Sequence, residues 1–492
     1  MKLEASKRLS ESVLWNLQHL AYDQFGPDAW AHKGVPFYLT SNPLIAKQFS
    51  AVILGYIRDG IEQGAINLSE PLYIFDLGAG SGRLGFLILK HLIPMVSEII
   101  SPGLKICYVM TDMIESNIEM CKKHPFLEKY ILSGNLDFAL YHHAQQLPLK
   151  FVCSGKILEN NTVINPVILI CTYYFDTVPQ DLFKAKSGRL EEGRISIAVS
   201  NQNSPSKVPD LSAEMIADLE CFYDYIPIDN LNNYYPDRPE YNQLLEDYGK
   251  LFDNTPFLFP IGGLESLRFF SNLSNGRLLL LAGDQGVSTE EQVRVWGDPK
   301  ICLHATFSMP VSYHLLAEYF HNRGGIGFLT SSPNPKYVVM CGIIGKNSKM
   351  FPNAKNAFYQ EVDFFEPIEY FELTDLKEAT LAEASLKSLL LYIKIGNWDP
   401  VNLNQFIPEI LKKLPQATEQ EKEFLYFTIN RVWENFYPVN SDEGEFVMNL
   451  GVLLFQISKY QEALCFFQEA LKLLGANSVL LKNIAICRSV IR

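Results

Sequence analysis

The chain has 492 residues, 48% hydrophobic and 20% charged, which is enough to bury the cores of two or three domains. Its formal net charge of -13 argues against general nucleic-acid binding, which needs basic surface, and mildly favours a basic partner. Nine scattered cysteines form no CxxC pair, so neither a zinc site nor a disulfide framework is expected. Without a signal-peptide pattern or an apolar run of membrane length, we expect a soluble cytoplasmic protein that does not bind membranes.

The elements in chain order predict an α/β domain that begins with helices. Residues 1–70 are expected to be helical, because SESVLWNLQHLAYDQF and residues 43–63 place apolar side chains at helical spacing. The apolar runs LYIFDLG, KICYVMTD, GNLDFAL and VILICTYYFD then alternate with helical segments, which is typical of a parallel, doubly wound sheet. Residues 201–260, rich in Asp, Asn, Tyr and Pro, are interpreted as an insertion over one end of that sheet. The strand patterns GRLLLLAGD, HATFSMPV and KYVVMCGIIG complete a domain that spans 71–370.

From about residue 371 the pattern is helical throughout, which predicts a separate all-α domain over 371–492. The segment GEFVMNLGVLLFQISKYQEALCFFQEALKLLGAN fits a tetratricopeptide repeat, with Gly451, Ala463, Phe467 and Ala470 at its small, small, aromatic and small positions. Small residues there let two antiparallel helices approach closely, and the aromatic ring fills the gap. The tail is expected either to recruit a partner or to act as a helical cap that binds nothing.

The stretch FDLGAGSGRLG joins an apolar strand to a helix through a glycine-rich turn. A phosphate-binding P-loop would end in Gly-Lys followed by Ser or Thr, and this turn does not. A dinucleotide fingerprint is met by Gly80, Gly82 and Gly85, but it leaves Asp76 and Gly78 unexplained. An acidic residue followed by G-x-G-x-G is similar to the first motif of the class I S-adenosylmethionine methyltransferases. Glycines would let the backbone contact the ligand directly, and Asp76 would hold the turn and, through water, the ligand's ammonium group.

Two later aspartates support S-adenosylmethionine over a dinucleotide as the ligand. KICYVMTD ends in Asp112, where an acidic residue would accept hydrogen bonds from ribose hydroxyls. GNLDFAL is expected to place Asp137 after the third strand, where a carboxylate can accept from the adenine amino group. Open α/β sheets bind ligands at the carboxyl ends of their strands, so both carboxylates are predicted to lie at that edge.

Three further segments, in order, resemble the MidA-like methyltransferases over about residues 20–345. They are FYLTSNPLIAKQFSAVILGYI, NPVILICTYYFDTVPQDLF and ICLHATFSMPVSYHLLAEYFHNRGG, and the second matches the family's fourth-strand motif at Phe175, Asp176 and Pro179. The family includes the mitochondrial complex I assembly factor that methylates arginine on a partner subunit. The resemblance implies a class I methyltransferase fold, S-adenosylmethionine as donor and a protein substrate. With motif I and the two aspartates, the predicted cofactor-binding residues are Tyr38, Ser41, Asp76, Gly78, Gly80, Gly82, Asp112, Asp137 and Thr172.

Two departures from the family leave the methyl acceptor open. The family's Asn-Glu pair falls on Thr172 and Tyr173, and the Ser-Pro-Glu of its N-terminal loop becomes Ser41, Asn42 and Pro43. A glutamate could orient a guanidinium, whereas a tyrosine is neutral near pH 7. Besides arginine, a neutral amide, a hydroxyl or a carboxylate becomes possible as the acceptor, as does loss of activity.

Asp176 and Tyr173 are the predicted catalytic residues. Methyl transfer is an in-line displacement, so a protonated acceptor needs a nearby base. Asp176 is expected just past the fourth strand, close to where the methyl group should point. Tyr173 is the second candidate for this base and His304 a third, although a strand aromatic or a lone histidine is more often structural.

Two functions are carried forward from these patterns. The first is an S-adenosylmethionine-dependent protein methyltransferase whose tail recruits its target, with the insertion as a substrate wall suited to a basic peptide. The second is a scaffold that keeps the fold without catalysis and binds partners through its tail. A nicotinamide oxidoreductase is a third interpretation of the glycines. His142 and His143 show no further metal-ligand spacing, so no metal is expected.

Overall fold

The computed structural model describes residues 2–26, 29, 39–199, 213–303, 306–332, 334–345, 350–374, 378–440 and 443–491. The chain divides into two compact units. The first holds Met1–Thr40 and Gln48–Glu366, and the second holds Ser41–Lys47 and Pro367–Arg492. None of the described helices is long and apolar enough to cross a membrane.

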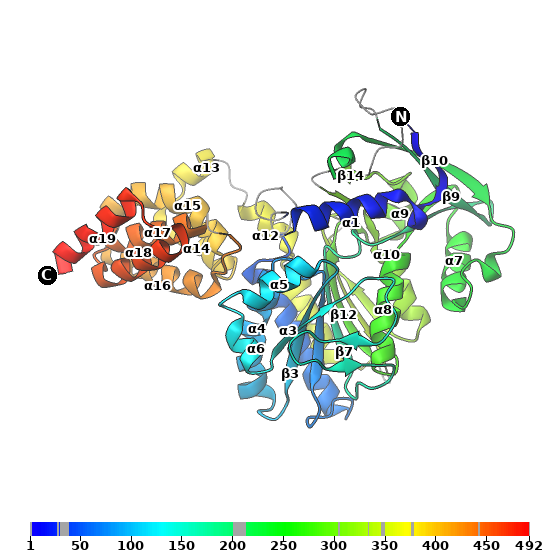
Figure 1. The fold of residues 1–492 in the computed structure, drawn as a ribbon, viewed down its shortest axis with the longest axis horizontal. Helices are drawn as coiled ribbons and strands as arrows, with labels where there is room; N and C mark the ends of the chain where they lie inside the picture. Colours follow the sequence, from blue (N-terminus) through cyan, green and yellow to red (C-terminus); the bar gives the residue numbers. More distant parts are fainter. Residues whose placement is uncertain are drawn as a thin grey trace. The chain divides into compact units, whose positions relative to one another are not determined.

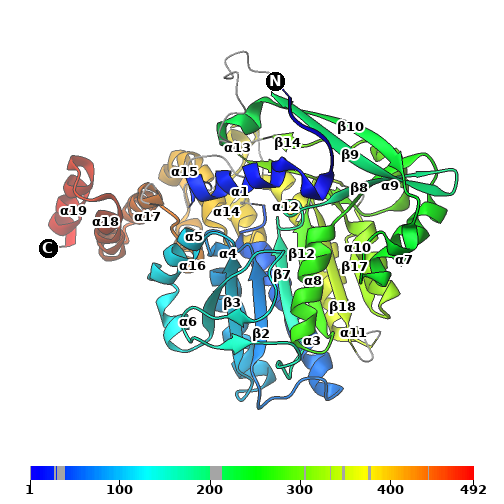
Figure 2. The same cartoon turned by 45° about the vertical axis from the view of Figure 1, so that its right-hand side comes forward.

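The first unit is built on a seven-stranded sheet (Figures 1 and 2). In spatial order its strands are β17 (Ile326–Leu329), β18 (Val338–Ile344), β12 (Leu278–Asp284), β7 (Val167–Thr172), β2 (Leu72–Leu77), β3 (Ile106–Asp112) and β4 (Leu136–Leu140). The five strands from β12 to β4 are parallel, and β18 is antiparallel to both of its neighbours. This order, with one reversed strand beside the edge, is the sheet of the class I methyltransferase fold, so the predicted fold class is confirmed.

One predicted strand of this sheet is wrong, and one was missed. The described part of HATFSMPV, from Thr306 onward, lies outside the sheet. It contains β15 (Phe307–Ser308), which pairs with β14 (Cys302–Leu303), and the first residue of β16 (Val311–Ser312), which pairs with β13 (Gly286–Val287). A third short pair joins β5 (Leu149–Lys150) to β6 (Ile157–Leu158). The missed strand is β17, whose Gly327 breaks the apolar pattern. A Cβ at Gly327 would lie 3.0 Å from Ala317 Cα, so the glycine lets the preceding helix, Tyr313–Asn322, approach the strand closely.

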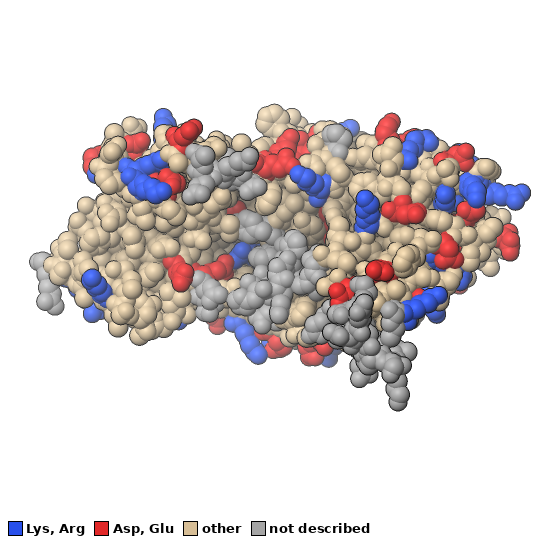
Figure 3. Space-filling view, turned by 90° about the horizontal axis from the view of Figure 1, so that it is seen from above, with Lys and Arg blue, Asp and Glu red and all other residues tan. Residues whose placement is uncertain are grey.

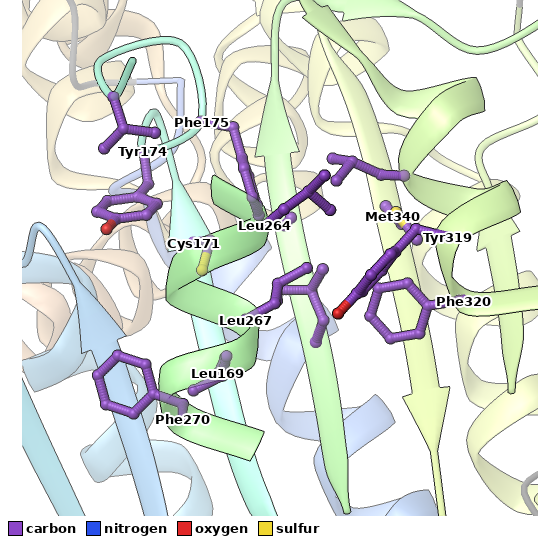
Figure 4. Packing of buried hydrophobic residues seen from close by; sticks show 14 of the residues in the cluster. Leu169, Cys171, Tyr174, Phe175, Leu264, Leu267, Phe270, Tyr319, Phe320 and Met340 are labelled. Carbon is purple, nitrogen blue, oxygen red and sulfur yellow. The ribbon is translucent and has the colours of Figure 1, made fainter. Parts of the chain in front are cut away.

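Helices pack on this sheet because its central strands are apolar on both faces. They are α3 (Pro43–Glu62), which begins in the second unit, α4 (Arg83–Met95), α5 (Glu115–Lys123), α6 (Glu128–Leu132), α8 (Ile261–Leu273), α10 (Tyr313–Asn322) and α11 (Pro352–Ala357). In Figure 4, Leu264, Leu267 and Phe270 of α8 lie over Leu169 and Cys171 of β7, and all five belong to one buried apolar cluster.

A second, antiparallel sheet is also part of the first unit. It contains β1 (Lys2–Arg8), β8 (Asp181–Lys186), β9 (Arg189–Val199), β10 (Leu219–Pro227) and β11 (Thr255–Phe259), with α7 (Pro239–Leu251) and α9 (Glu290–Trp296) beside it. The expectation of helix at the N-terminus is wrong for β1, whose side chains alternate between exposed and half-buried positions. The segment between β7 and β12 therefore contains ordered strands well before residue 201.

Helix α1 (Val13–Phe25) lies across the carboxyl ends of the central strands in Figures 1 and 2. The Ser12 hydroxyl caps its first turn by accepting from the Leu14 N–H. Gln18 Nε2 donates to the Phe307 carbonyl at 2.7 Å, and the Trp15 ring packs on Phe307 with centroids 5.4 Å apart. These contacts hold α1 over the carboxyl edge of the sheet, which is where open α/β sheets bind ligands.

The second unit is built of helices. Its first segment, Ser41–Lys47, contains the start of α3, and the helices from Pro367 onward form the rest. Its helices are α12 (Pro367–Thr374), α13 (Glu378–Glu383), α14 (Leu386–Ile395), α15 (Pro400–Lys413), α16 (Glu419–Asn435), α17 (Gly444–Gln456), α18 (Tyr460–Leu474) and α19 (Ser478–Ile491). A Cβ at Gly451 of α17 would lie 2.6 Å from the Phe467 ring of α18, so these two helices pack closely. The assignment of the tail to the tetratricopeptide repeats stays a prediction.

Candidate cofactor and acceptor site

The glycine-rich turn connects β2 to α4 at the carboxyl edge of the sheet. Gly78, Gly80 and Gly82 have φ values of +70°, +54° and +76°, a region that side chains disfavour. The Gly80 N–H donates to Asp112 Oδ2 at 3.1 Å, and the Cys121 thiol donates to the Gly80 carbonyl at 3.4 Å. The turn is thus fixed from both sides and presents backbone, without side chains, to a ligand.

Asp76 lies inside β2 and is buried. The Tyr108 hydroxyl donates to Asp76 Oδ2 at 2.8 Å, which joins β2 to β3. Burial raises the pKa of Asp76 to about 7, and the hydrogen bond from Tyr108 opposes part of that rise. Asp76 therefore supports the turn, and its water-mediated contact to a ligand stays a prediction.

Asp112 is the last residue of β3, as predicted, and its carboxylate organises the neighbouring loops. Oδ2 accepts from Gly80, and Oδ1 accepts from the Ile114 N–H at 2.9 Å and the Asn117 amide at 3.2 Å. Burial raises its pKa, and these hydrogen bonds oppose the rise. The structure thus brings Asp112 together with the glycine turn, and its contact to a ribose stays a prediction.

Asp137 does not lie at this edge. It is the second residue of β4, not the residue after it, and it pairs in register with Val109, in the middle of β3. Its carboxylate accepts from the N–H groups of Phe138, Cys153 and Ser154 at 2.8–3.0 Å. The predicted placement was wrong because the strand continues from Asp137 to Leu140, so the Asp137 carboxylate instead holds the backbone at Cys153 and Ser154.

The roles predicted for four other positions are not tested. Tyr38 and His304 lie outside the described residues. Ser41 belongs to the second unit, and its role in cofactor binding stays a prediction. Thr172 is the half-buried last residue of β7, opposite Gly283 of β12, at the predicted edge of the sheet.

The loop after β7 is held by close packing against α8. A Cβ on Gly263 would lie 2.2 Å from the Phe175 ring, and a Cβ on Gly262 would lie 3.0 Å from Pro179. The Gly262 N–H donates to the Pro179 carbonyl at 2.8 Å. Phe175 and Pro179 of the resemblance motif therefore have a structural role, which is to fix the loop that carries Asp176.

Tyr173 and Tyr174 turn in different directions from this loop. Tyr173 has a φ of +49°, and its N–H donates to the Gly283 carbonyl at 3.0 Å. Burial, with Asp284 and Asp176 nearby, raises the pKa of Tyr173 far above its usual value, which favours a neutral phenol over a base. The Tyr174 hydroxyl lies 2.8 Å from Ser266 Oγ, and its ring would contact a Cβ on Gly78 at 3.5 Å.

Asp176 lies beside a second buried carboxyl group that the sequence analysis missed, Asp284 at the end of β12. The Asp176 N–H donates to Asp284 Oδ2 at 3.1 Å, which places the two buried carboxyl groups beside each other. Burial raises the pKa of Asp176 to about 7; burial and then the charge of Asp176 raise that of Asp284 well above its usual value. Two buried carboxyl groups side by side disfavour double ionisation, so at most one of them is charged near neutral pH.

Three more tyrosines surround the pair, and none was predicted. Tyr313 begins α10 and Tyr337 precedes β18, and both are fully buried beside Asp176 and Asp284. Tyr22 reaches the site from α1, where its pKa is raised by burial and by Asp176, Asp112 and Asp284. The charges of both Asp112 and Asp176 therefore act on the Tyr22 hydroxyl. Only Asp284 had a sequence signal, since it ends GRLLLLAGD as Asp112 ends KICYVMTD.

His142 and His143 follow β4, and their rings are tilted by 43° with centroids 4.0 Å apart. The His19 ring of α1 meets that of His142 edge-on at 6.5 Å. Burial and the neighbouring ring lower the pKa of His143 to about 3, so it is neutral. Among the residues that the structure describes, no group of three or more potential ligands is placed to hold a metal ion.

No protein-family model and no curated protein matches the chain. Among solved structures, it is similar to a Burkholderia thailandensis protein crystallised with S-adenosyl-homocysteine, at 13% identity and a TM-score of 0.39, over 73% of this chain and 85% of that one. It is also similar to magnesium protoporphyrin IX methyltransferase from Synechocystis PCC 6803 with bound SAM, at 10% identity and a TM-score of 0.29, over 69% and 100%. At these scores the likeness carries no argument, and the function is inferred from the chain's own geometry.

Proposed function

We propose that the protein is an S-adenosylmethionine-dependent methyltransferase that acts on a protein side chain. The observation that carries the proposal is the turn of three left-handed glycines, joined through Gly80 to Asp112 at the end of the next strand. In a class I methyltransferase sheet this is the place of the methyl donor. The donor supplies an activated methyl group, and the protein supplies binding and alignment.

The residues present fit this cofactor. Because the three glycines carry no side chains, a ligand can contact the turn's backbone directly. Asp112 offers a buried carboxylate to ribose hydroxyls, in addition to the N–H groups that it already accepts. Asp176 lies past the neighbouring strand, on the side from which an acceptor would approach.

A nicotinamide cofactor is the competing ligand, because Gly80, Gly82 and Gly85 satisfy its spacing. A Cβ on Gly85 would lie 2.5 Å from Met110 Cε and 2.8 Å from the Tyr108 ring. Gly85 is thus explained by close packing of α4 on β3, whichever ligand binds. Gly78, which the dinucleotide pattern leaves out, has the same left-handed conformation as Gly80 and Gly82, which favours S-adenosylmethionine.

The helical tail is proposed to recruit the protein substrate. The acidic net charge of -13 suits a basic partner. On the face shown in Figure 3, however, acidic and basic side chains are interspersed, so no single-sign patch on that face selects the partner. The alternative function is a scaffold that binds cofactor and partners without transferring a methyl group, which the departures at Thr172 and Tyr173 favour.

Isothermal titration with S-adenosylmethionine and with NADH tests the cofactor. Binding of the first alone supports the proposal, and binding of NADH alone replaces it with an oxidoreductase. Incubation with methyl-labelled donor and candidate proteins then separates the two remaining functions. Labelled protein supports the enzyme, whereas tight donor binding without any transfer favours the scaffold.

A further inference from the structure

Three buried oxygen atoms, one of the Asp176–Asp284 pair and two of tyrosines near it, are left unsatisfied among the described residues. Asp176 Oδ1 and the hydroxyls of Tyr313 and Tyr337 are buried and have no hydrogen-bond partner among the described residues. Both oxygens of Asp284 are used, since Oδ2 accepts from the Asp176 N–H and Oδ1 accepts from the Gln285 N–H. Buried polar atoms without partners are costly, so such a cluster indicates a ligand.

The cluster also lacks a counter-charge. No cationic side chain in the described part of the chain pairs with Asp176 or Asp284, and none is among the causes of their shifted pKa values. A buried carboxylate without a partner is unfavourable, and a ligand with one positive charge would neutralise the pair.

The Tyr337 hydroxyl packs so closely against Gly283 that no larger residue fits between them. A Cβ on Gly283, the residue before Asp284, would lie 2.0 Å from the Tyr337 hydroxyl oxygen. Only glycine at this position lets the phenol lie against the end of β12, next to the carboxyl pair. The neighbouring Tyr313 lies close enough to both aspartates for their charges to raise its pKa.

We propose that Asp176 Oδ1, the Tyr313 hydroxyl and the Tyr337 hydroxyl form the subsite for a protonated primary amine, which is the methyl acceptor. An ammonium group has three donors around a compact charge, which suits three separate acceptor oxygens. A guanidinium is planar and is best bound by paired oxygens of one carboxylate, and here one oxygen of Asp176 is free. This proposal rests on the proposed methyltransferase function and names its acceptor class.

The chemistry at this subsite balances without a further reagent. One N–H proton of the ammonium passes to the Asp176 carboxylate, which leaves a neutral amine and an uncharged carboxyl pair. The amine lone pair then forms the N–C bond to the methyl carbon as the C–S bond breaks, and sulfur keeps that electron pair. The products are an N-methylammonium group and S-adenosylhomocysteine.

Sinefungin tests the subsite without a known protein substrate. It is an analogue of the methyl donor with a primary ammonium group where the methyl sulfonium would be, so that its charge faces the acceptor subsite. In isothermal titrations of the full chain, sinefungin should bind more tightly than S-adenosylhomocysteine, by about tenfold for one charge-assisted hydrogen bond. Asp176→Asn should remove that advantage and leave the affinity for S-adenosylhomocysteine unchanged.

A second variant and a control keep the test decisive if Asp176→Asn does not fold. Tyr337→Phe removes one acceptor oxygen and should reduce the affinity for sinefungin alone, whereas Asp137→Asn, a buried carboxylate away from the edge, should change neither ligand. Equal affinities for both ligands in the wild type, or equal losses of both in the variants, would overturn the amine subsite. Failure of S-adenosylhomocysteine to bind at all would instead overturn the proposed function, and the subsite with it.

Discussion

Gly80 is the residue at which a single side chain should separate ligand binding from folding. Its φ is +54°, its N–H is held by Asp112 and its carbonyl accepts from the Cys121 thiol. A β-branched residue in this conformation costs about 1–2 kcal/mol or more and adds a side chain where the ligand should contact backbone. Gly80→Val should therefore lose S-adenosylmethionine binding in isothermal titration while the helical tail stays folded.

Gly188 provides the matched control for this prediction. It lies in the β8–β9 hairpin with a φ of +73°, and a Cβ there would meet no atom within 4 Å. Gly188→Val carries the same kind of backbone strain and should bind the ligand normally. Unchanged affinity in Gly80→Val would remove the glycine turn from the site.

Asp76 predicts a pH dependence of stability. Burial raises its pKa from 3.8 to about 7, so between these values the folded carboxyl keeps a proton that the unfolded chain releases. Its contribution to the free energy of unfolding falls as pH rises, by up to about 1.4 kcal/mol per pH unit, and levels off above pH 7. Asp76→Asn keeps an acceptor for Tyr108 and removes the titration. From pH 5 to pH 8 the wild type should lose more stability in urea unfolding than this variant, and equal losses would contradict the shifted pKa.

The aspartates show how far single residues could be predicted from the sequence. Asp112 was placed correctly, because it ends an unbroken apolar strand. Asp137 failed the same rule, because its strand continues for three residues beyond it. Asp284 obeys the rule and could have been found. Tyr313 and Tyr337 could not, since they reach the carboxyl pair from α10 and from the start of β18, and only the folded sheet brings these segments together.

At the scale of elements, the contact between α17 and α18 depends on Gly451. A Cβ there would lie 2.6 Å from the Phe467 ring, so Gly451→Ala overpacks the pair at a cost of about 1–3 kcal/mol. The better helix propensity of alanine returns up to about 1 kcal/mol, so the net effect should be destabilising. Scanning calorimetry of the full chain should show a lower transition for the tail.

Phe467→Leu supplies the control for this helix pair. Alone it removes buried ring atoms and should also destabilise the tail, since Phe467 is 2% exposed. Combined with Gly451→Ala it makes room for the new methyl group, so the double variant should lose less than the sum of the single losses. Strict additivity would mean that the two side chains do not meet.

Elements were predictable where their apolar pattern was long. Six strands of the central sheet and the helices of the tail follow from periodicity, because burial on one or both faces enforces it. The failures are β1, β17, the other strands of the antiparallel sheet, and HATFSMPV, which was predicted for the central sheet. The side chains of β1 are half-buried or exposed, and β17 is a four-residue edge strand whose Gly327 serves the packing of α10. The apolar pattern of β1 and β17 is weak because few of their side chains are fully buried, whereas the edge strand β4 is buried over four of its five residues and was predicted.

At the scale of the whole molecule, the two units are not separated by a single cut. Ser41–Lys47 belong to the second unit, although the chain on either side of them belongs to the first. Within the second unit, the Asn397 amide donates to the Pro43 carbonyl at 2.9 Å. A boundary near residue 370, which the sequence predicts from the end of the strand patterns, does not reveal this return, because no local pattern marks a contact over 350 residues.

A chain that ends at Glu366 should therefore be less stable than the full chain. It keeps the seven residues Ser41–Lys47 without the rest of the unit to which they belong. Leu44 and Ile45, which are 5% and 0% exposed in the full chain, lie in that segment at the start of α3, and α3 continues into the first unit. The truncated chain should show a lower thermal midpoint and stronger binding of a hydrophobic dye. Asn397→Ala removes the hydrogen bond to Pro43 and places alanine at a φ of +54°, so it should cost about 1–2 kcal/mol and serves as the comparison. An unchanged midpoint after truncation would show instead that residues 367–492 are an appendage on which the first unit does not depend.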